Sequence, residues 1–211
     1  MFLESVSKAK VNNQRRDIHM KMNSVKEKIL NSTIELLGEC EAVEKVTIRD
    51  IALRAGVGVG LVNYHFQTKE NLVSLCVQRI IGDVIKRFDQ LSQSLDMEPL
   101  EKLRFLAKRN CSFLVQNKGI SRISILSDIE NGNYTDNTSQ TINAYFPIVR
   151  AVCSEKKSDK EIYLVTSILI SAFQSAFMRG NVYMEELELD FYEMHQRDII
   201  VDLIIDNIIK N

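Results

Sequence analysis

The chain has few of the residues that break regular structure. Its 211 residues include two prolines and eight glycines, and tryptophan is absent. Proline and glycine most strongly interrupt helices, so their scarcity favours long helices over a loop-rich β-protein. The alternation of apolar and polar residues that is typical of half-buried strands is also missing. These absences predict an all-α fold.

The sequence also lacks the features of a secreted or membrane protein. The first residues have no apolar core followed by a small-residue cleavage site, which a signal peptide requires. The most apolar segment, residues 162–178, is interrupted by serine, threonine and glutamine. A membrane-spanning helix needs about 20 predominantly apolar residues. We therefore expect a cytoplasmic protein without membrane contact.

Patterns that bind metals or cofactors are scarce as well. The four cysteines lie far apart: Cys40, Cys76, Cys111 and Cys153. No C-x-x-C pair and no closely spaced histidines accompany them, so the sequence predicts no metal site and no cofactor. In a reducing cytosol these thiols are expected to be buried or unreactive, with redox sensing as the alternative.

No catalytic constellation is apparent. The three histidines, His19, His65 and His195, belong to separate segments. They do not combine with an acid and a nucleophile into a recognisable reactive set. We therefore expect that the protein is not an enzyme.

Neither sign of charge is in large excess. The formal net charge is −1 at pH 7, and residues 1–73 contain eleven Lys and Arg against nine Asp and Glu. The clearest local excess is in residues 1–23, where five basic residues outnumber two acidic ones. This segment is expected to be an extension that either adds contacts to nucleic acid or is an inert tail. Any case for DNA binding must rest on particular residues.

What the chain does have is apolar residues at helical spacing. Residues 25–37 place such residues on one face, and a glycine ends the segment. A second helix is expected after Thr47, with Asp50 as its capping partner, and Gly56 supplies a sharp turn. A third short helix extends to about His65.

The helical pattern continues to the C-terminus. The predicted helices are residues 71–95, 99–117, 120–129, 138–156, 162–179 and 191–210. Thr68 is expected to cap the first of them, and Pro147 to kink or split the fourth. A short acidic link is expected after Gly180. The last two helices are apolar around most of their circumference, which predicts burial on several sides, either inside a monomer or across a dimer interface.

Three glycines recur at alternate positions in residues 55–66, AGVGVGLVNYHF. Such glycines are typical either of a phosphate-binding loop or of the turn in a DNA-reading module. A dinucleotide-binding loop follows a strand and has G-x-G-x-x-G spacing. Here a capped helix precedes the glycines and the spacing is G-x-G-x-G. The pattern therefore favours a helix-turn-helix, in which two short helices meet through a tight turn.

The residues around this turn resemble those of the TetR family of bacterial transcriptional regulators. The matching positions are Thr47, Ile51, Ala52, Ala55, Gly56, Val57, Gly60, Tyr64, His65, Phe66, Lys69, Glu70 and Leu72. The detailed match covers residues 25–73, and the rest agrees only in length and all-α character. Two positions depart from the family pattern: Gly58 stands where serine is common, and Asn63 where an aromatic residue is common.

The resemblance implies that ten residues contact DNA: Thr47, Arg49, Gly58, Val59, Gly60, Leu61, Asn63, Tyr64, His65 and Lys69. Arg49 and Asn63 are expected to read base edges, since arginine pairs with guanine and asparagine with adenine. Val59 and Leu61 can touch a thymine methyl, and the remaining side chains are expected at phosphates. Gly58 has no hydroxyl, so backbone N–H groups at the start of the recognition helix are expected to bind phosphate.

The resemblance also implies a domain organisation. A helix-turn-helix domain of three helices is expected over residues 24–70, after the extension of residues 1–23. A larger helical bundle over residues 71–211 is expected to bind an effector and to dimerise through the last two helices. Candidate pocket residues are apolar or weakly polar side chains of the middle helices: Phe105, Cys111, Phe113, Leu126, Tyr145, Phe146, Phe173 and Phe177.

The expected function is that of a sequence-specific transcriptional regulator. In this family it is most often a homodimeric repressor, released from a near-palindromic double-stranded DNA operator by a small molecule. The alternatives are a partner-binding or structural helical bundle and, least favoured, an enzyme. The sequence leaves open the identity of the effector, the operator, the regulated genes and the choice between repression and activation.

Overall fold

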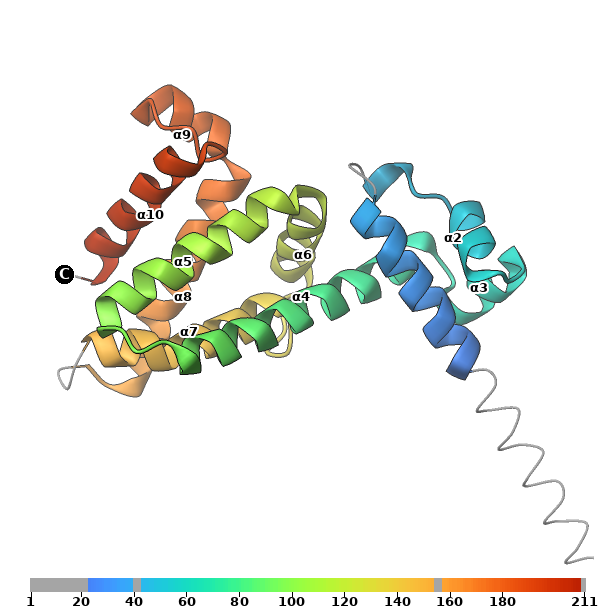
Figure 1. Ribbon diagram of the computed structural model, residues 1–211, viewed down its shortest axis with the longest axis horizontal. Helices are drawn as coiled ribbons and strands as arrows, with labels where there is room; N and C mark the ends of the chain where they lie inside the picture. Colours follow the sequence, from blue (N-terminus) through green and yellow to red (C-terminus); the bar gives the residue numbers. More distant parts are fainter. Residues whose placement is uncertain (1–22, 40–42, 154–156, 210–211) are drawn as a thin grey trace, which may run out of the picture. The chain divides into compact units, whose positions relative to one another are not determined.

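The computed structural model of the chain describes residues 23–39, 43–153 and 157–209 (Figure 1). Regular structure in these ranges is helical, without a strand, which confirms the predicted all-α fold. The expected basic extension, residues 1–23, lies outside the described residues except for its last position. Cys40 lies outside them as well.

The chain divides into two compact units, Met1–Cys76 and Val77–Asn211. The division falls inside α4 (Lys69–Ser94), somewhat later than the expected boundary at residue 70. The first turns of α4 belong to the N-terminal unit because they complete its core. Leu72 is fully buried there, and the Cys76 thiol donates to the carbonyl oxygen of Leu30 at 3.6 Å.

The N-terminal unit consists of short helices around one small core. A first helix over residues 23–39 is followed by the 3-10 turn η1 (Val43–Lys45), by α2 (Ile48–Ala55) and by α3 (Val59–Phe66). The core is built from apolar side chains of all these segments and of α4: Ile29, Leu30, Leu37, Val43, Val46, Ile51, Ala52, Ala55, Val62, Phe66, Leu72, Val73 and Cys76. Because each segment contributes to it, burial in this core positions α2 and α3 within the unit.

The C-terminal unit is a larger helical bundle that also contains the rest of α4. Its helices are α5 (Pro99–Gln116), α6 (Lys118–Asn131), α7 (Asn137–Cys153), α8 (Asp159–Met178), α9 (Gly180–Leu187) and α10 (Met194–Ile209). Both α5 and α8 pack against α7 and α10 (Figure 1). Their shared core holds Phe173, Phe177 and Phe191, each almost completely buried.

α7 continues through Pro147, so a split at that residue is not found. Proline removes one helical hydrogen bond and leaves the carbonyl oxygen of Asn143, four residues earlier, without its usual donor. Both Asn143 and Pro147 are exposed. Water can therefore satisfy that carbonyl group, and the helix is maintained.

The segment after Gly180 was expected to be an acidic link, and this expectation is wrong. It forms α9, which ends at Glu188 in the left-handed region, with φ of 56°. Glu185 and Glu186 are good helix formers, and their charges lie on an exposed surface. The acidic residues thus marked a solvated helix and not a loop.

In the described part of the chain, α8 alone is long and apolar enough to cross a membrane by length and composition. However, 39% of its most apolar window is buried within the protein, and a core helix meets the same criterion. A capping box stabilises the start of α8. The Glu161 N–H donates to the Ser158 hydroxyl, and the Ser158 N–H donates to the Glu161 carboxylate at 2.7 Å.

Candidate DNA-binding site and ligand cavity

α2 begins with a complete capping box. The Thr47 N–H donates to Asp50 Oδ2 at 3.0 Å, and the Asp50 N–H donates to Thr47 Oγ1 at 3.2 Å. The Thr47 hydroxyl also donates to Asp50 Oδ2 at 2.6 Å. These bonds stabilise the carboxylate and lower the pKa of Asp50. The cap orients Thr47 at the exposed start of α2.

The turn between α2 and α3 requires a glycine. Gly56 lies in the left-handed region, with φ of 59° and ψ of 41°, and its N–H donates to the carbonyl oxygen of Leu53 at 3.1 Å. The next N–H, that of Val57, donates to the carbonyl oxygen of Ala52 at 3.0 Å. A residue with a Cβ is strained in this conformation. The glycine therefore ends α2 sharply and permits α3 to start three residues later.

α3 attaches to the unit through two residues and exposes most of the others. Val62 and Phe66, four residues apart, are buried in the core. The exposed set consists of Val59, Gly60, Leu61, Asn63 and Tyr64. These are the positions expected on the reading face, so the described geometry leaves them accessible to a partner.

The start of α3 has no side-chain cap. Gly58 is its N-cap, with extended backbone and no side-chain hydrogen bond to the helix. The first N–H groups of a helix have no intrahelical acceptor, and they carry the positive end of the helix dipole. Gly58 and Gly60 both have open space around them, since no described atom lies within 4 Å of the position that a Cβ would take. An anion can therefore approach these N–H groups closely.

At the C-terminal end of α3, Tyr64 is 67% exposed and its ring lies edge-on to His65, with 5.3 Å between ring centroids. His65 and Lys69 are half-buried. Lys69 follows the predicted cap Thr68, whose hydroxyl accepts the N–H of Asn71 at 3.1 Å. The three expected phosphate-contacting side chains thus follow one another from α3 into α4.

Two arginines of α2 differ in their surroundings. Arg54 forms a bidentate pair with Glu39, at 2.9 Å and 2.6 Å, and this attaches α2 to the first helix. Arg49 is exposed and has no hydrogen-bond or ion-pair partner within the described ranges. An unengaged guanidinium is free to contact a base or a phosphate, whereas that of Arg54 is already used.

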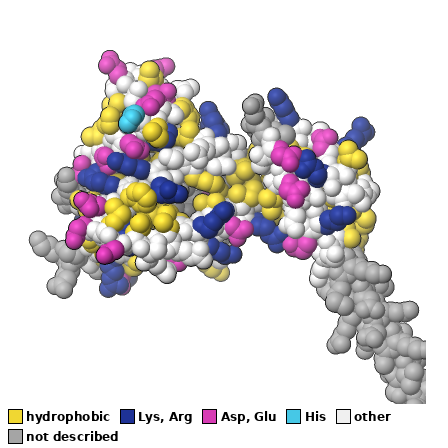
Figure 2. Space-filling view, in the orientation of Figure 1, with side chains coloured by type: hydrophobic (Ala, Val, Ile, Leu, Met, Phe, Trp, Pro, Cys, Tyr) yellow, Lys and Arg dark blue, Asp and Glu magenta, His cyan; other side chains and the backbone are white. Residues whose placement is uncertain are grey.

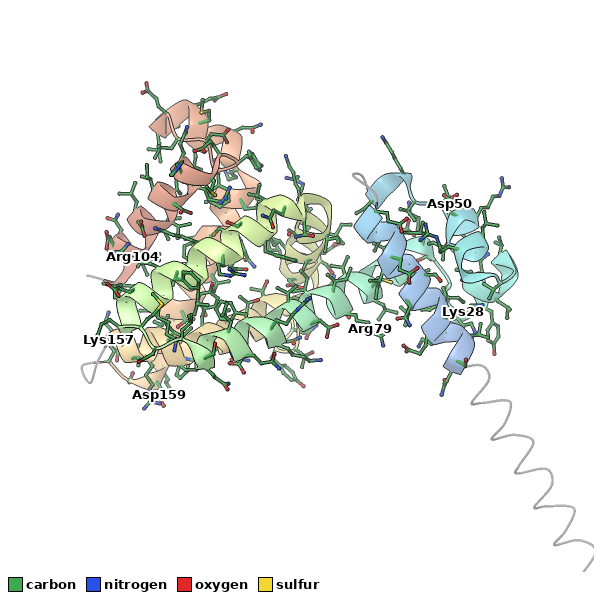
Figure 3. All side chains as sticks on the ribbon, in the orientation of Figure 1. Lys28, Asp50, Arg79, Arg104, Lys157 and Asp159 are labelled. Atoms are coloured by element: carbon green, nitrogen blue, oxygen red, sulfur yellow. The ribbon has the colours of Figure 1, made fainter. Side chains whose placement is uncertain are left out.

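The first helix adds basic residues that the sequence patterns did not single out. The Lys28 ammonium lies beside the turn, 3.5 Å from where a Cβ on Gly56 would stand (Figure 3). Lys26 Nζ lies 5.9 Å from the centroid of the Phe66 ring. Their proximity to the turn depends on the packing of the first helix, so spacing along the chain does not reveal it.

The C-terminal unit contains a cavity of about 740 Å³. Four of the expected pocket residues line it: Phe105, Phe113, Tyr145 and Phe173. The other four do not: Cys111 and Phe177 are completely buried in the core, Phe146 packs against that core, and Leu126 is 49% exposed. Aromatic or apolar character alone did not distinguish the residues facing the cavity from those of the core.

The cavity also has polar lining residues that were not expected. α6 and α7 contribute six of them: Ser121, Ser124, Asp128, Asn137, Thr138 and Thr141. The spacing of Ser121, Ser124 and Asp128 places them on one face of a helix. This spacing is visible in the sequence, but only the structure shows that this face of α6 is directed inward.

Ion pairs join α5, which contributes to the cavity wall, to α10. Arg104 Nη1 lies 2.8 Å from Asp202 Oδ1, and its other amino group pairs with Asp206 (Figure 3). Lys108, which lines the cavity, lies 2.7 Å from the second oxygen of Asp202. Within the described residues, no group of three or more His, Cys, Asp or Glu side chains is placed to hold a metal ion.

The fold and these surfaces define a helix-turn-helix DNA-binding protein with a separate helical unit. Residues 29–76 match the family model described as bacterial regulatory proteins, tetR family. An HTH-type transcriptional regulator of Staphylococcus aureus (strain bovine RF122 / ET3-1) is 22% identical over 173 residues, which cover 81% of this chain and 88% of that protein.

Solved structures agree in fold. The complex of RolR with resorcinol has a TM-score of 0.58 at 18% identity, covering 90% of this chain and 89% of that one. The SmeT–triclosan complex has a TM-score of 0.55 at 17% identity, covering 87% and 91%. SmeT is the repressor of a Stenotrophomonas maltophilia multidrug efflux pump. The predicted resemblance to the TetR family is confirmed over residues 29–76, and the chain is a DNA-binding transcriptional regulator with the fold of that family.

Proposed function

We propose that this regulator is a repressor whose affinity for its operator is lowered by a small molecule bound in the C-terminal unit. The observation that carries the proposal is the presence, in one chain, of an exposed recognition helix and of a cavity of about 740 Å³ in the other unit. Ligand pockets typically measure about 300–1,000 Å³. The cavity is therefore large enough for a drug-sized molecule.

Base reading is assigned to Arg49 and Asn63. Both are exposed polar side chains, one on α2 and one on α3, whereas the other exposed side chains of α3 are mostly apolar. Asparagine can form paired hydrogen bonds with adenine, and arginine with guanine. Val59 and Leu61 are suited to contact thymine methyl groups.

Phosphate contacts are assigned to the helix start and to the side chains that follow α3. The N–H groups after Gly58 are accessible, and Gly60 leaves room for the backbone to approach. Tyr64, His65 and Lys69 supply the side-chain contacts. The Thr47 hydroxyl already donates to Asp50, so it acts chiefly by capping α2, and it can donate to a phosphate only by giving up that bond.

The operator-binding form is proposed to be a homodimer through α8 and α10. Both helices expose large apolar side chains although their other faces are buried: Tyr163, Leu164, Ile168, Ile199 and Leu203. On the visible face of the C-terminal unit, apolar side chains gather between charged ones (Figure 2). A two-fold dimer would present two recognition helices to successive major grooves, about 34–36 Å apart, of a near-palindromic site.

The cavity is proposed to hold the effector. Phe105, Phe113, Tyr145 and Phe173 are its aromatic contacts. RolR and SmeT, which share the fold, are described as complexes with resorcinol and triclosan. A coupling of about 1–3 kcal/mol between ligand and DNA would change operator affinity about 5–150-fold. The protein is proposed to act in the cytoplasm, by binding and not by catalysis.

The test is a DNA-binding titration with the region upstream of the protein's own gene. The full chain should retard this DNA in a gel at concentrations where unrelated DNA of equal length is not retarded. A screen of small molecules should then identify one that releases it. Asn63→Ala should reduce the preference for the upstream DNA, and Ser127→Ala, on α6 outside the cavity lining, should not.

Two results would contradict the proposal. Equal affinity for upstream and unrelated DNA would favour a partner-binding helical bundle. If the DNA complex persists with every molecule that is shown to bind the cavity, the protein is a DNA-binding regulator that does not respond to ligand.

A further inference from the structure

We propose that the cavity binds a neutral aromatic molecule carrying a hydroxyl group, and that Ser121 forms the hydrogen bond to that hydroxyl. This inference rests on the proposed function, because it names the chemical class of the effector for the same cavity. It depends on three features of the described residues: the orientation of α6, the hydrogen bonds of the polar lining, and the aromatic character of the remaining wall.

α6 buries two serines beside Ile120 and Ile125, and it exposes two other large apolar side chains. Ser121 and Ser124 are 1% and 6% exposed, whereas Leu126 and Ile129 are 49% and 72% exposed. Burying a hydroxyl without a hydrogen bond costs about 1–3 kcal/mol, while leaving leucine in water forgoes a favourable burial. An arrangement that is unfavourable on both faces indicates that the inward polar groups serve binding.

Among the polar lining side chains, Ser121 is the buried one whose hydroxyl has no described partner. The Asn137 amide donates to Ser124 Oγ at 3.0 Å, and the Gln174 amide donates to the Thr138 hydroxyl at 2.9 Å. Ser121 belongs to the cavity lining, and its Oγ is buried and has no hydrogen-bond partner among the described residues, so a small side-chain rotation would present it to a ligand. The Ser121 oxygen can accept a hydrogen bond, so a ligand hydroxyl that donates to it matches, whereas a ligand without a donor does not.

The remaining wall favours an aromatic body. Phe88 and Tyr145 stack with 4.6 Å between ring centroids, and both line the cavity. The Tyr145 hydroxyl donates to the carbonyl oxygen of Leu106 at 3.2 Å, so this ring presents mainly its apolar surface to the cavity. α4 adds Ile81, Val84 and Ile85. Aromatic ligand rings pair favourably with such aromatic side chains.

The charged lining groups do not call for a charged ligand. Asp128 Oδ2 accepts the N–H and the hydroxyl of Thr138, both at 2.8 Å. Lys108 pairs with Asp202 at 2.7 Å. Arg109 lies over the ring of Phe105, with 5.8 Å to its centroid. Asp128 and Lys108 are thus already engaged, and Arg109 is exposed to solvent. Of the other charged lining residues, Arg87 donates to the carbonyl oxygen of Asp83 at 3.2 Å, and Asp198 is a half-buried carboxylate.

The test compares four matched probes by isothermal titration calorimetry with the full chain and no DNA. They are 4-pentylphenol, its methyl ether 4-pentylanisole, the anionic 4-pentylbenzoic acid and the cationic 4-pentylbenzylamine. We expect the phenol to bind about five- to tenfold more tightly than the ether, the difference of one well-placed hydrogen bond. The acid and the amine should bind more weakly than the phenol.

Ser121→Ala should abolish the preference for the phenol over the ether, and Ser127→Ala should retain it. Because Ser121→Ala removes a buried hydroxyl that has no described partner, its Tm without ligand should be unchanged or higher. A lower Tm would show a structural hydrogen bond. That result, or equal affinity for phenol and ether in the unsubstituted protein, or no binding of any probe up to its solubility, would overturn the proposal.

Failure of this inference is distinguishable from failure of the proposed function. If the phenol binds through Ser121 and leaves the operator complex intact, the ligand class stands and the ligand-responsive repressor falls. If the acid or the amine binds more tightly than the phenol and releases DNA, the repressor stands and the ligand class is wrong.

Discussion

α3 in the N-terminal unit and α6 in the C-terminal unit depart from ordinary amphipathic helices in different ways. α3 buries Val62 and Phe66 but exposes Val59 and Leu61. α6 also exposes large apolar side chains and, in addition, directs buried hydroxyls such as Ser121 inward. α5, in contrast, buries Leu103, Leu106 and Ala107 in the usual manner. Both departures coincide with a proposed binding surface.

The two helices differ in the location of the polar groups that lack a hydrogen-bond partner within the protein. In α3 it is the backbone N–H groups at an exposed helix start, which water solvates until DNA replaces it. In α6 it is a side-chain hydroxyl inside a cavity, where the cost of burial persists until a ligand bonds to it. A surface that binds a large polyanion can remain hydrated, whereas the serine hydroxyl in the cavity is withdrawn from water.

The largest expected effect separates the two faces of α3. Phe66→Ala removes a buried aromatic side chain from a small core and should destabilise the N-terminal unit by about 3–5 kcal/mol. Tyr64→Ala, at a side chain that is 67% exposed, should change stability by less than about 0.5 kcal/mol but weaken DNA binding. Urea unfolding followed by circular dichroism measures the first, and fluorescence anisotropy with labelled DNA the second. Equal destabilisation by both variants would contradict this division.

The second effect concerns how much α3 reads through a side chain. Asn63→Ala should lower operator affinity by about 1–3 kcal/mol without weakening non-specific binding, because a base contact is lost and phosphate contacts are kept. Anisotropy titrations at several salt concentrations should give the same salt slope for the variant and the unsubstituted protein. A reduced slope would mean that Asn63 contacts a phosphate instead.

The third effect concerns the turn that positions α3. Gly56→Ala should destabilise the N-terminal unit by about 1–2 kcal/mol, because alanine is strained at a left-handed φ. Gly60→Ala is the matched control: it lies inside a helix with open space around it, so it should stabilise the unit by about 0.5–1 kcal/mol while it weakens DNA binding. If Gly60→Ala leaves the affinity for DNA unchanged, the backbone of α3 does not approach DNA closely at that point.

The smallest effect compares the capping boxes of the two units. Thr47→Ala and Ser158→Ala should each cost about 1 kcal/mol. Hydrogen bonds from the capping residues lower the pKa of Asp50 and of Glu161. A lowered pKa means that each carboxylate stabilises its helix above its pKa in the unfolded chain, about 4, and that this contribution is lost as pH falls through the lower folded value. Stability curves for Asp50→Asn and Glu161→Gln should therefore approach that of the unsubstituted protein below about pH 3. Differences that persist at low pH would exclude the carboxylates as their source.

Local sequence patterns were sufficient for the helix-turn-helix. The capping pair of Thr47 and Asp50, the turn glycine and the two buried residues of α3 act within a few positions of one another, so the spacing along the chain carries the geometry. Long-range pairings were not accessible in this way. The Arg54–Glu39 ion pair and the position of Lys28 beside Gly56 depend on how the first helix packs against the turn.

The pocket shows the same limit more strongly. The sequence patterns favoured aromatic and other apolar residues as candidate pocket residues. Of these candidates, Phe113 and Phe173 line the cavity, whereas Cys111 and Phe177 are buried in the core and do not line it. A core and an apolar cavity wall have the same composition, and only packing distinguishes them. The sequence shows that the polar residues of α6 recur at helical spacing and share one face. However, such an amphipathic pattern normally predicts that the polar face is exposed.

By itself the sequence determined the all-α fold, the helix-turn-helix and the family, because caps, turns and helical periodicity are properties of neighbouring residues. Only the tertiary structure decided that α4 belongs to both units, that Ser121 faces inward and that a cavity lies among the helices of the C-terminal unit. The orientation of a helix about its own axis is determined by its packing against all the helices around it. No single segment of the chain contains that information.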